Sequence, residues 1–254
     1  MEMVNDSDDI KNLSDNEIIG KPKLNNSEII FSGSGNILYF EDGVVLSDTS
    51  IRFCGDNSII YLSKSKFPYF LNLMILNNSI IFIGENNKFY PFVNISISNN
   101  QNLIIGCDCI IESNVTLGSM HDFELIDLNS KEKILNKNSI YVGDHVSICS
   151  HSFVSNGVEI GSGAILNSCT FVPDFSSLNS NTLYSGNPIT SLRNNISYII
   201  EDNYNDNIEF KYNNNETLSP EKINSVLNKV EGKKIILVLE EIFIKNKKHD
   251  RLSI

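Results

Sequence analysis

Four histidines are the side chains of this chain best suited to take up and release protons near neutral pH. His249 lies in a charged tail, and His145 and His151 share one position of a six-residue repeat, where we expect them to face outward at corners. His121 lies where this repeat gives way to a longer segment. Because binding sites favour loops carried on rigid scaffolds, His121 is the candidate general base for activating a hydroxyl group. The competing interpretation is a solvated loop residue.

The imidazole of a general base needs a group that fixes its orientation. Asp122, Glu124 and Asp127 follow His121 in the sequence, and each carboxylate could accept a hydrogen bond from the ring. A backbone carbonyl would serve equally well, so the sequence leaves the orienting group open.

Five cysteines suggest other chemistry, namely a disulfide framework, a metal site or a nucleophile. Their number is odd and none of them forms a Cys-x-x-Cys pair, which argues against disulfides and against zinc, so we expect no metal. Cys149 falls at a repeat corner and is not expected to act as a nucleophile, while Cys109 fits a small inward position. The full set is Cys54, Cys107, Cys109, Cys149 and Cys169.

The six-residue repeat runs through the second half of the chain. Every sixth residue from Val142 to Leu178 is Ile, Leu or Val, and Tyr184 follows at the same spacing. Four residues after each of these positions the side chain is small, as at Ala164 and Thr182. The pattern predicts a chain that turns a corner every six residues and points one aliphatic and one small side chain inward. Three such hexads close one triangular coil.

The same repeat occurs upstream and is interrupted once. Hexads begin at Ile105, Ile111 and Leu117, and then the segment His121–Tyr141 breaks the period. We therefore expect this segment to leave the coil as an inserted loop. The alternative architecture is an antiparallel β-sandwich, but that fold would show period-two alternation and hairpin turns in place of the six-residue step.

Longer repeats precede the hexads. Segments that begin at Gly33, Gly55 and Asn77 each combine a glycine- or asparagine-rich corner with a run of apolar residues. They predict looser coils with aromatic side chains at inward positions. Their Gly and Asn residues suit corners that require a positive φ.

The chain divides into three expected regions. Residues 1–22 are acidic and lack periodicity, so we expect a flexible segment or a short first element. We expect residues 23–190 to form the repeat domain and residues 191–254 to form a C-terminal extension with helices. The motif Ser219-Pro220-Glu221 resembles a helix start, and a second helix is expected over 233–248. Because the end of a solenoid exposes apolar surface and strand edges, we favour a capping role for this extension over partner binding.

Composition excludes several function classes. The formal net charge of −11 argues against binding of nucleic acid through its phosphates and against an anionic membrane surface. The longest apolar run, Ile235–Leu239, is too short to span a bilayer. The acidic N-terminus does not resemble a signal peptide, so we expect a cytoplasmic protein.

The hexads, the loop inserted between coils, Met120-His121 and Ser185-Gly186-Asn187-Pro188 together resemble the left-handed β-helix acyltransferases. Within that superfamily the chain is most similar to bacterial O-acetyltransferases of capsular polysaccharide, including polysialic acid. The resemblance implies an all-β, left-handed parallel β-helix, a homotrimer with acetyl-CoA bound between neighbouring subunits, and His121 as the base that takes the proton from a sugar hydroxyl.

The donor residues that the resemblance implies lie along the last coils. Many relatives have Val-Trp-Ile-Gly where this chain has Val146-Ser147-Ile148-Cys149, which removes a stacking Trp and a Gly that allows close approach of CoA. Arg193 could pair with a CoA phosphate or be an ordinary surface arginine. The expected acetyl-CoA contacts are Ser147, Cys149, Ser168, Cys169, Asn187 and Arg193.

Three functions remain open at this stage. The leading one is transfer of acetyl from acetyl-CoA to a hydroxyl of a capsular or surface polysaccharide. The alternatives are an N-acyltransferase acting on a nucleotide-linked amino sugar and a non-catalytic β-helix scaffold, the latter suggested by Ser147 and Cys149.

Overall fold

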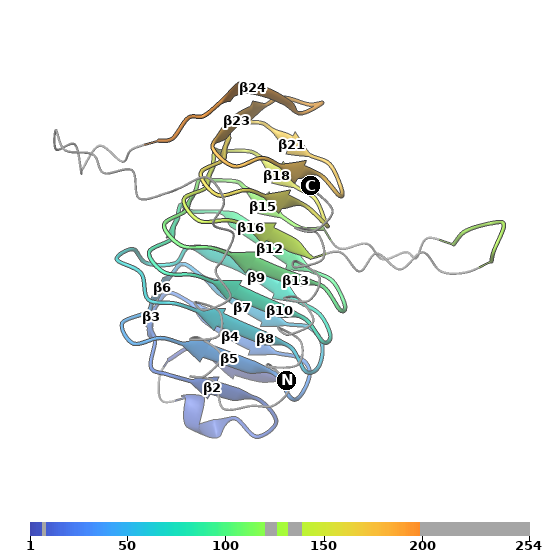
Figure 1. Ribbon diagram of the computed structural model, residues 1–254. Helices are drawn as coiled ribbons and strands as arrows, with labels where there is room; N and C mark the ends of the chain where they lie inside the picture. The colour runs from blue at the N-terminus through green and yellow to red at the C-terminus, as the bar shows by residue number, and fades with distance from the viewer. Residues whose placement is uncertain (7–8, 120–125, 132–138, 199–254) are drawn as a thin grey trace, which may run out of the picture. The chain divides into compact units, whose positions relative to one another are not determined.

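The computed structural model describes residues 1–6, 9–119, 126–131 and 139–198. Their strands stack into a β-solenoid in which the chain visits three faces in turn (Figure 1). Within the described chain the ladders are parallel, except where β1 pairs with β4 and β23 with β24. The predicted parallel β-helix is therefore confirmed, and the antiparallel sandwich is excluded.

The three faces follow from the pairing of the strands. Face A contains β1 (Glu2–Val4), β4 (Glu28–Phe31), β7 (Ser50–Phe53), β9 (Leu71–Ile75), β12 (Val93–Ile97), β15 (Thr116–Leu117), β18 (Phe153–Val154) and β21 (Phe171–Val172). Face B contains β2 (Glu17–Ile19), β5 (Ile37–Phe40), β8 (Ile59–Leu62), β10 (Ile80–Ile83), β13 (Asn102–Ile105), β16 (Ile140–Val142), β19 (Glu159–Ile160) and β22 (Ser177–Leu178). Face C contains the pair β3 (Lys23–Asn25) and β6 (Val45–Ser47), followed by β11 (Lys88–Phe89), β14 (Ile110–Ile111), β17 (Ser147–Ile148), β20 (Ile165–Leu166), β23 (Thr182–Ser185) and β24 (Thr190–Asn194).

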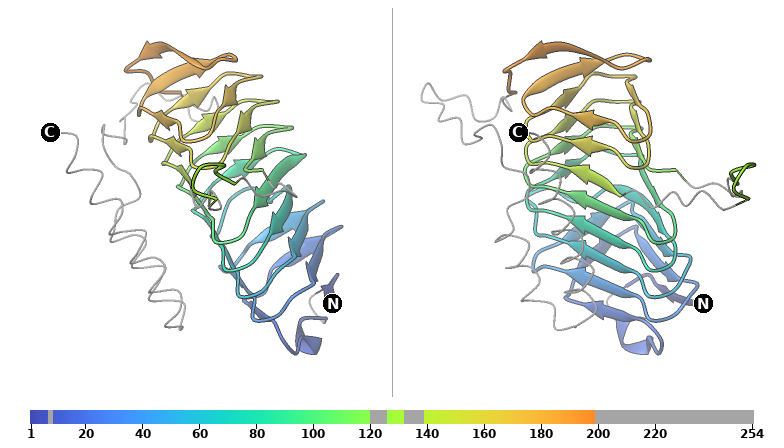
Figure 2. Two further views of the ribbon diagram at one scale, coloured as in Figure 1. Left: turned by 90° about the vertical axis from the view of Figure 1, so that its right-hand side faces the viewer. Right: turned by 45° about the vertical axis from the view of Figure 1, so that its right-hand side comes forward.

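The coils come in two sizes. Before the insertion, hydrogen bonds between neighbouring coils join residues 22 apart, as from Ile80 N–H to Asn102 Oδ1. After the insertion they join residues 18 apart, as from Asp144 N–H to Ser162 Oγ. The shorter period is the one that three hexads predict. Figure 2 shows the two kinds of coil stacked in one continuous column.

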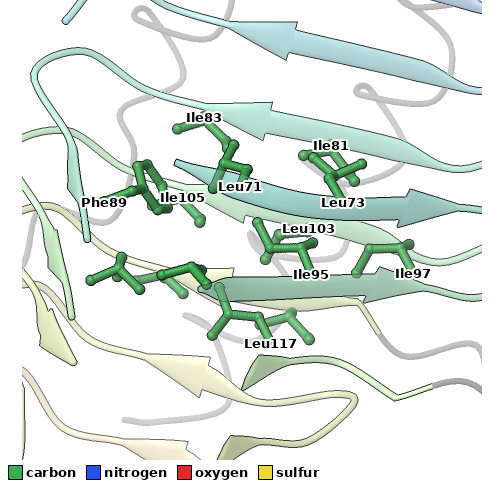
Figure 3. Packing of buried hydrophobic residues seen from close by; sticks show 14 of the residues in the cluster. Leu71, Leu73, Ile81, Ile83, Phe89, Ile95, Ile97, Leu103, Ile105 and Leu117 are labelled. Carbon is green, nitrogen blue, oxygen red and sulfur yellow. The ribbon is translucent and has the colours of Figure 1, made fainter. Parts of the chain in front are cut away.

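The core confirms the inward assignments of the hexads. The aliphatic series from Val142 to Leu178, with Tyr184 after it, lies in one buried cluster. The cluster continues into the earlier coils, where Figure 3 shows the packing of residues between Leu71 and Leu117. The small residues of the second series, such as Val158, Ala164 and Thr170, are buried beside it. Burial of a continuous apolar column stabilises each coil through its neighbours.

Aromatic side chains of the wider coils lie on both sides of the sheets. Phe31 and Phe53 are fully buried and stack with ring centroids 4.7 Å apart. The aromatic positions that recur along face B, however, point outward, which corrects the expectation of inward placement. Tyr39, Tyr61 and Phe82 alternate with the core positions of their strands and form an outer stack with centroid distances of 4.5 and 5.4 Å.

The corners adopt the positive φ that the sequence indicates. In the wider coils this conformation falls on residues such as Asn57 and Asn78, and asparagine tolerates it better than most residues. In the narrower coils it recurs every six residues, at His145, His151 and Gly157 among others. The left-handed corner conformation thus marks the fourth position of each hexad.

The described part of residues 1–22 forms short regular elements, so of the two alternatives for this segment the structure has first elements in place of a flexible one. Strand β1 closes face A, a short 3₁₀ helix spans Asp9–Asn12, and β2 already belongs to face B. The Glu2 carboxylate fixes the turn between them by accepting hydrogen bonds from Asn16 Nδ2 at 2.7 Å and from Ser14 N–H at 2.6 Å. These bonds, led by the one from Asn16, lower the pKa of Glu2 to about 2.

The last coil is closed by β24, which folds back antiparallel onto β23. The expected helices over 219–248 lie outside the described residues. Within the described ranges, no helix is long and apolar enough to cross a membrane.

Candidate functional site

The insertion leaves and rejoins the solenoid at the edge between faces A and B. It starts after β15, at Gly118 and Ser119, and returns to β16 from Ser139. His121, Asp122 and Glu124 lie outside the described residues. The expected insertion is two residues too long at its end. Ile140 and Tyr141 belong to β16, because Ile140 pairs with Leu103 and fills the inward position beside it.

Ser119, two residues before His121, makes three hydrogen bonds with the side chain of Asn156. Its N–H donates to Asn156 Oδ1 at 3.3 Å, and Asn156 Nδ2 donates to the Ser119 carbonyl at 3.2 Å and to its hydroxyl at 3.1 Å. Asn156 is only 3% exposed and its own N–H donates to Asp174 Oδ1. A buried amide whose two ends are both satisfied is rigid, so the start of the insertion has a fixed position.

Gly118 adds a second constraint to this position. Its φ is 79°, and a Cβ there would lie 2.3 Å from the carbonyl oxygen of Ser96 on the preceding coil. No other residue fits such a close approach without a shift of the backbone. Sequence reasoning missed Asn156 as the residue that anchors this corner, because its only visible signal is an ordinary Asn-Gly turn.

Asp127, one of the possible orienting groups, is engaged in its own turn. Its carboxylate accepts hydrogen bonds from the N–H groups of Asn129 at 2.7 Å and Ser130 at 2.9 Å, and its carbonyl accepts one from Lys131 N–H. The bonds from Ser130 and Asn129 lower the pKa of this carboxyl. Asp127 therefore stabilises the local turn of the insertion.

The expected donor residues gather on face C and at its edge with face A. Ser147 lies on the outer side of β17 between Ile110 and Ile165, and is 8% exposed. Cys149 begins the following corner and is half-buried, and Ser168 and Cys169 are exposed in the same corner one coil later.

Asn187 and Arg193 complete this set on the last coil. Asn187 is exposed at the same edge and precedes Pro188 through a cis peptide bond. Arg193 is exposed on β24 opposite Leu183, at the other end of that strand. Five of the six predicted donor residues thus follow one edge of the solenoid, and Arg193 stands apart.

The insertion and the donor edge lie on opposite edges of face A. In each coil the chain enters face A from the donor edge and leaves it at the edge where the insertion starts, as β15 does between Glu112 and Ser119. One chain therefore does not bring the start of the insertion and the donor edge together.

Cys149 is poorly suited to nucleophilic attack. Burial raises the pKa of its thiol, the negative charge of Glu112 raises it further, and only a hydrogen bond from Ser147 acts in the other direction. The thiolate is the reactive form of cysteine, so a raised pKa leaves the group inert near neutral pH. In the part of the chain that the structure describes, no group of three or more His, Cys, Asp or Glu residues is placed to hold a metal.

The two corner histidines both lie at corners of the solenoid but differ in their surroundings. His151 is exposed, whereas the His145 ring stacks on Tyr198 with centroids 4.1 Å apart. His145 Nε2 also lies 3.1 Å from the Tyr198 carbonyl oxygen. The chain after β24 returns along this corner, where Ile196 N–H donates to the Asn181 carbonyl. Burial is the largest influence on the pKa of His145 and lowers it.

Comparison with known proteins supports the architecture. No family model and no curated protein matches the sequence. Among solved structures, the polySia-specific acetyltransferase NeuO is 24% identical, with a TM-score of 0.64 over 74% of this chain and 86% of its own. The polysialic acid O-acetyltransferase OatWY is 15% identical, with a TM-score of 0.57 over 78% of this chain and 94% of its own. The chain has the left-handed β-helix fold.

Proposed function

We propose that this chain is an acyltransferase that moves acetyl from acetyl-CoA to a hydroxyl of a bacterial capsular or surface polysaccharide, with sialic-acid polymers as the favoured acceptor class. The supporting observation is that the fold matches 86% of a polySia-specific acetyltransferase and 94% of a polysialic acid O-acetyltransferase. The rigid corner that carries the insertion with His121 agrees with it. We place this activity in the cytoplasm.

In this proposal His121 is the general base that activates the acceptor hydroxyl. It takes the proton from the acceptor hydroxyl as the oxygen attacks the thioester carbonyl carbon. The C–O bond forms, the C–S bond breaks, and the proton passes from His121 to the departing CoA sulfur. Backbone N–H groups near the reacting carbonyl stabilise the oxyanion of the tetrahedral intermediate.

The site is completed by a second copy of the chain. The insertion starts at one edge of face A and the donor edge is the other, so His121 of one subunit meets acetyl-CoA bound along a neighbour. Ser147, Cys149, Ser168, Cys169 and Asn187 line that donor edge, and Arg193 pairs with a phosphate of CoA. In a cyclic homotrimer each subunit gives its insertion to one neighbour and its donor edge to the other, so all three sites are complete.

The decisive experiment measures release of free thiol from acetyl-CoA with polysialic acid as acceptor. His121→Ala should lower turnover by about 10²–10⁴-fold, the range expected for loss of a general base. Its melting temperature and its thermal shift with CoA should stay unchanged, because the residue acts on the acceptor. His145→Ala, a histidine at the edge between faces B and C and away from the donor edge, is the matched control and should keep full rate. Full activity of His121→Ala would mean that another base does the work.

A non-catalytic scaffold is the second candidate. It is favoured by the half-buried Cys149 and the covered Ser147, which leave less room for CoA along the donor edge. A ligand that binds only the folded protein raises its melting temperature. Absence of any thermal shift with CoA, together with absence of transfer to any polymer, would establish the scaffold.

A further inference from the structure

An exposed group of aromatic side chains lies on the donor edge, before the coils that hold the predicted donor residues. Phe92 is 73% exposed and Tyr90 is 38% exposed, and both belong to the turn between β11 and β12. This turn leads from face C to face A, so it lies on the same edge of the solenoid as the corner of Cys149. Large apolar side chains gathered in contact with solvent are typical of a binding surface.

The backbone of Phe92 shows that its ring does not serve to stabilise the turn. Its φ is 68°, in the left-handed region that bulky side chains rarely adopt. The equivalent corner of the next coil has Asn114 with a φ of 60°, and asparagine tolerates this conformation better. A phenylalanine that strains its backbone and leaves most of its ring in solvent contributes little to folding, and such residues are typical of functional sites.

A lysine and a third aromatic ring complete the group. Lys88 Nζ lies 4.8 Å from the centroid of the Tyr90 ring and 5.1 Å from that of Phe67, which comes from the preceding coil. The backbone around Phe67 is tied to the coil of Lys88, because Ser65 Oγ accepts a hydrogen bond from Phe67 N–H and donates one to the Asn87 carbonyl. The three rings and the ammonium group therefore form one cluster.

The charge of this cluster is open to an anion. Lys64, in the same region, is paired with Glu85 at 3.7 Å. Among the described residues no carboxylate forms an ion pair with Lys88, and Lys66 is a further exposed cation beside Phe67. In a chain with a formal net charge of −11, such a local positive charge favours a negatively charged ligand here.

A sugar chain that carries carboxylates matches both properties of the cluster. The C–H groups on one face of a sugar ring pack on an aromatic ring, and a lysine ammonium group pairs with the carboxylate of a sugar acid. Neutral sugars would use the rings alone.

The position of the cluster suits the acceptor of the proposed reaction. The insertion leaves after β15, one coil before the coil that holds Ser147 and Cys149, so the reacting carbonyl belongs at the N-terminal end of the donor edge. Phe92 lies two coil spacings before the corner of Cys149, or about 10 Å, which is farther than one sugar ring spans. The cluster therefore lies where a polymer would continue beyond the sugar that is acetylated.

We propose that Phe67, Lys88, Tyr90 and Phe92 form an acceptor subsite, which binds a carboxylate-bearing sugar chain at a sugar next to the one that receives acetyl. This inference rests on the proposed function and adds to it the residues that select an acidic polymer. No bond is formed or broken at the subsite.

Titration calorimetry of the full-length protein with polysialic acid, without acetyl-CoA, tests the subsite. Phe92→Asn should weaken binding by at least about fivefold, because the ring that covers the sugar is lost. Its melting temperature should stay equal or rise, since asparagine suits the φ of this corner, whereas loss of a purely structural ring would lower it. Phe92→Tyr keeps a ring and should keep the affinity. Lys88→Gln should weaken binding by about two- to fivefold, with the larger loss at low salt.

Two controls accompany these variants. Tyr39→Asn removes an outward, half-buried ring from face B, across the coil from the donor edge, and should leave the affinity unchanged. Dextran is a neutral polymer and should bind more weakly than polysialic acid. Equal affinity for dextran, or no binding of polysialic acid to the parent protein, would overturn the inference.

The transfer assay separates this inference from the proposed function. Phe92→Asn should raise KM for polysialic acid by about fivefold and leave kcat unchanged, because the subsite does not touch the reacting atoms. If the parent transfers acetyl and Phe92→Asn keeps both its affinity and its KM, the subsite is refuted and the proposed function stands. If the parent binds the polymer through Phe92 but transfers nothing, the subsite stands and the proposed function fails.

Discussion

The coils before the insertion and those after it solve the same packing problem in different ways. From β4 to β13 the strands of faces A and B have four or five residues, and the wider interior is filled by aromatic rings such as Phe31 and Phe53. From β17 to β22 the strands have two residues, and a narrower interior is filled by one aliphatic and one small side chain per hexad. Coil circumference and inward side-chain volume are therefore matched within each half.

The corners differ in the same way. In the wider coils, amide side chains form ladders from coil to coil, as where Asn77 Nδ2 donates to Asn99 Oδ1 at 2.7 Å. In the narrower coils, corner backbone groups bind short side chains, as in the bond from Asp144 N–H to Ser162 Oγ. The insertion lies within the first coil of the narrower kind, between β15 and β16.

The largest loss of stability is expected when an inward aromatic ring is removed from a wider coil. Phe53→Ala should lower the free energy of unfolding by about 3–5 kcal/mol, because the neighbouring coils cannot collapse into the cavity. The measurement is urea unfolding followed by circular dichroism. Phe171→Ala removes an outward ring of the narrower half and is the control, with a loss well below that of Phe53→Ala. Equal losses would show that ring position does not govern stability.

A smaller loss of stability is expected when a larger side chain replaces a small inward one in a narrower coil. Ala164 is fully buried at a small inward position, so Ala164→Leu should cost about 1–3 kcal/mol through overpacking. Ala164→Ser is the control and should cost less. Thr170, at the same position of the next hexad, donates from its hydroxyl to the carbonyl three residues earlier, and a serine at 164 has the same partner available in Gly161. Tolerance of leucine would contradict the tight fit of this half.

The smallest effect concerns the pH dependence of stability. Burial lowers the pKa of His145 in the folded protein, so the unfolded chain binds more protons than the folded one as the pH falls. The stability contributed by neutral His145 is thus present above the normal histidine pKa and decreases as the pH falls through that value toward the lowered one. His145→Gln should reduce the difference in melting temperature between pH 7.5 and pH 5 by about 1–2 °C, since the ring is only partly buried.

The control for this prediction is His151→Gln, at an exposed position of the next corner. An identical profile for the parent and His145→Gln would show that contact with Tyr198 does not perturb the ring.

The sequence predicts the fold best where the six-residue repeat is regular. From Val142 onward the period is regular, so both the inward residues and the coil length were predicted correctly. Upstream, apolar residues occupy both sides of the face B strands, so alternation could not show that Tyr39 and Tyr61 point outward. The N-terminal elements show no periodicity in the sequence. The turn between β1 and β2 is fixed instead by hydrogen bonds to one carboxylate, that of Glu2.

The candidate site was predictable only in part. The repeat indicates where the insertion leaves the solenoid, and hence that His121 follows a corner. The anchoring of Ser119 by Asn156 joins residues 37 apart, a separation created by the insertion itself, so no periodic pattern reveals it. The burial of His145 likewise could not be predicted, because it depends on stacking with Tyr198, a residue that follows the last coil in the sequence.

The two antiparallel strands limit how molecules of this kind can aggregate. A parallel solenoid presents at each end a template on which another molecule could continue all three ladders and grow into a fibre. Here β1 reverses the direction on face A at one end, and β24 reverses it on face C at the other. A second molecule therefore cannot continue the parallel ladders of all three faces at either end, so the solenoid does not polymerise end to end.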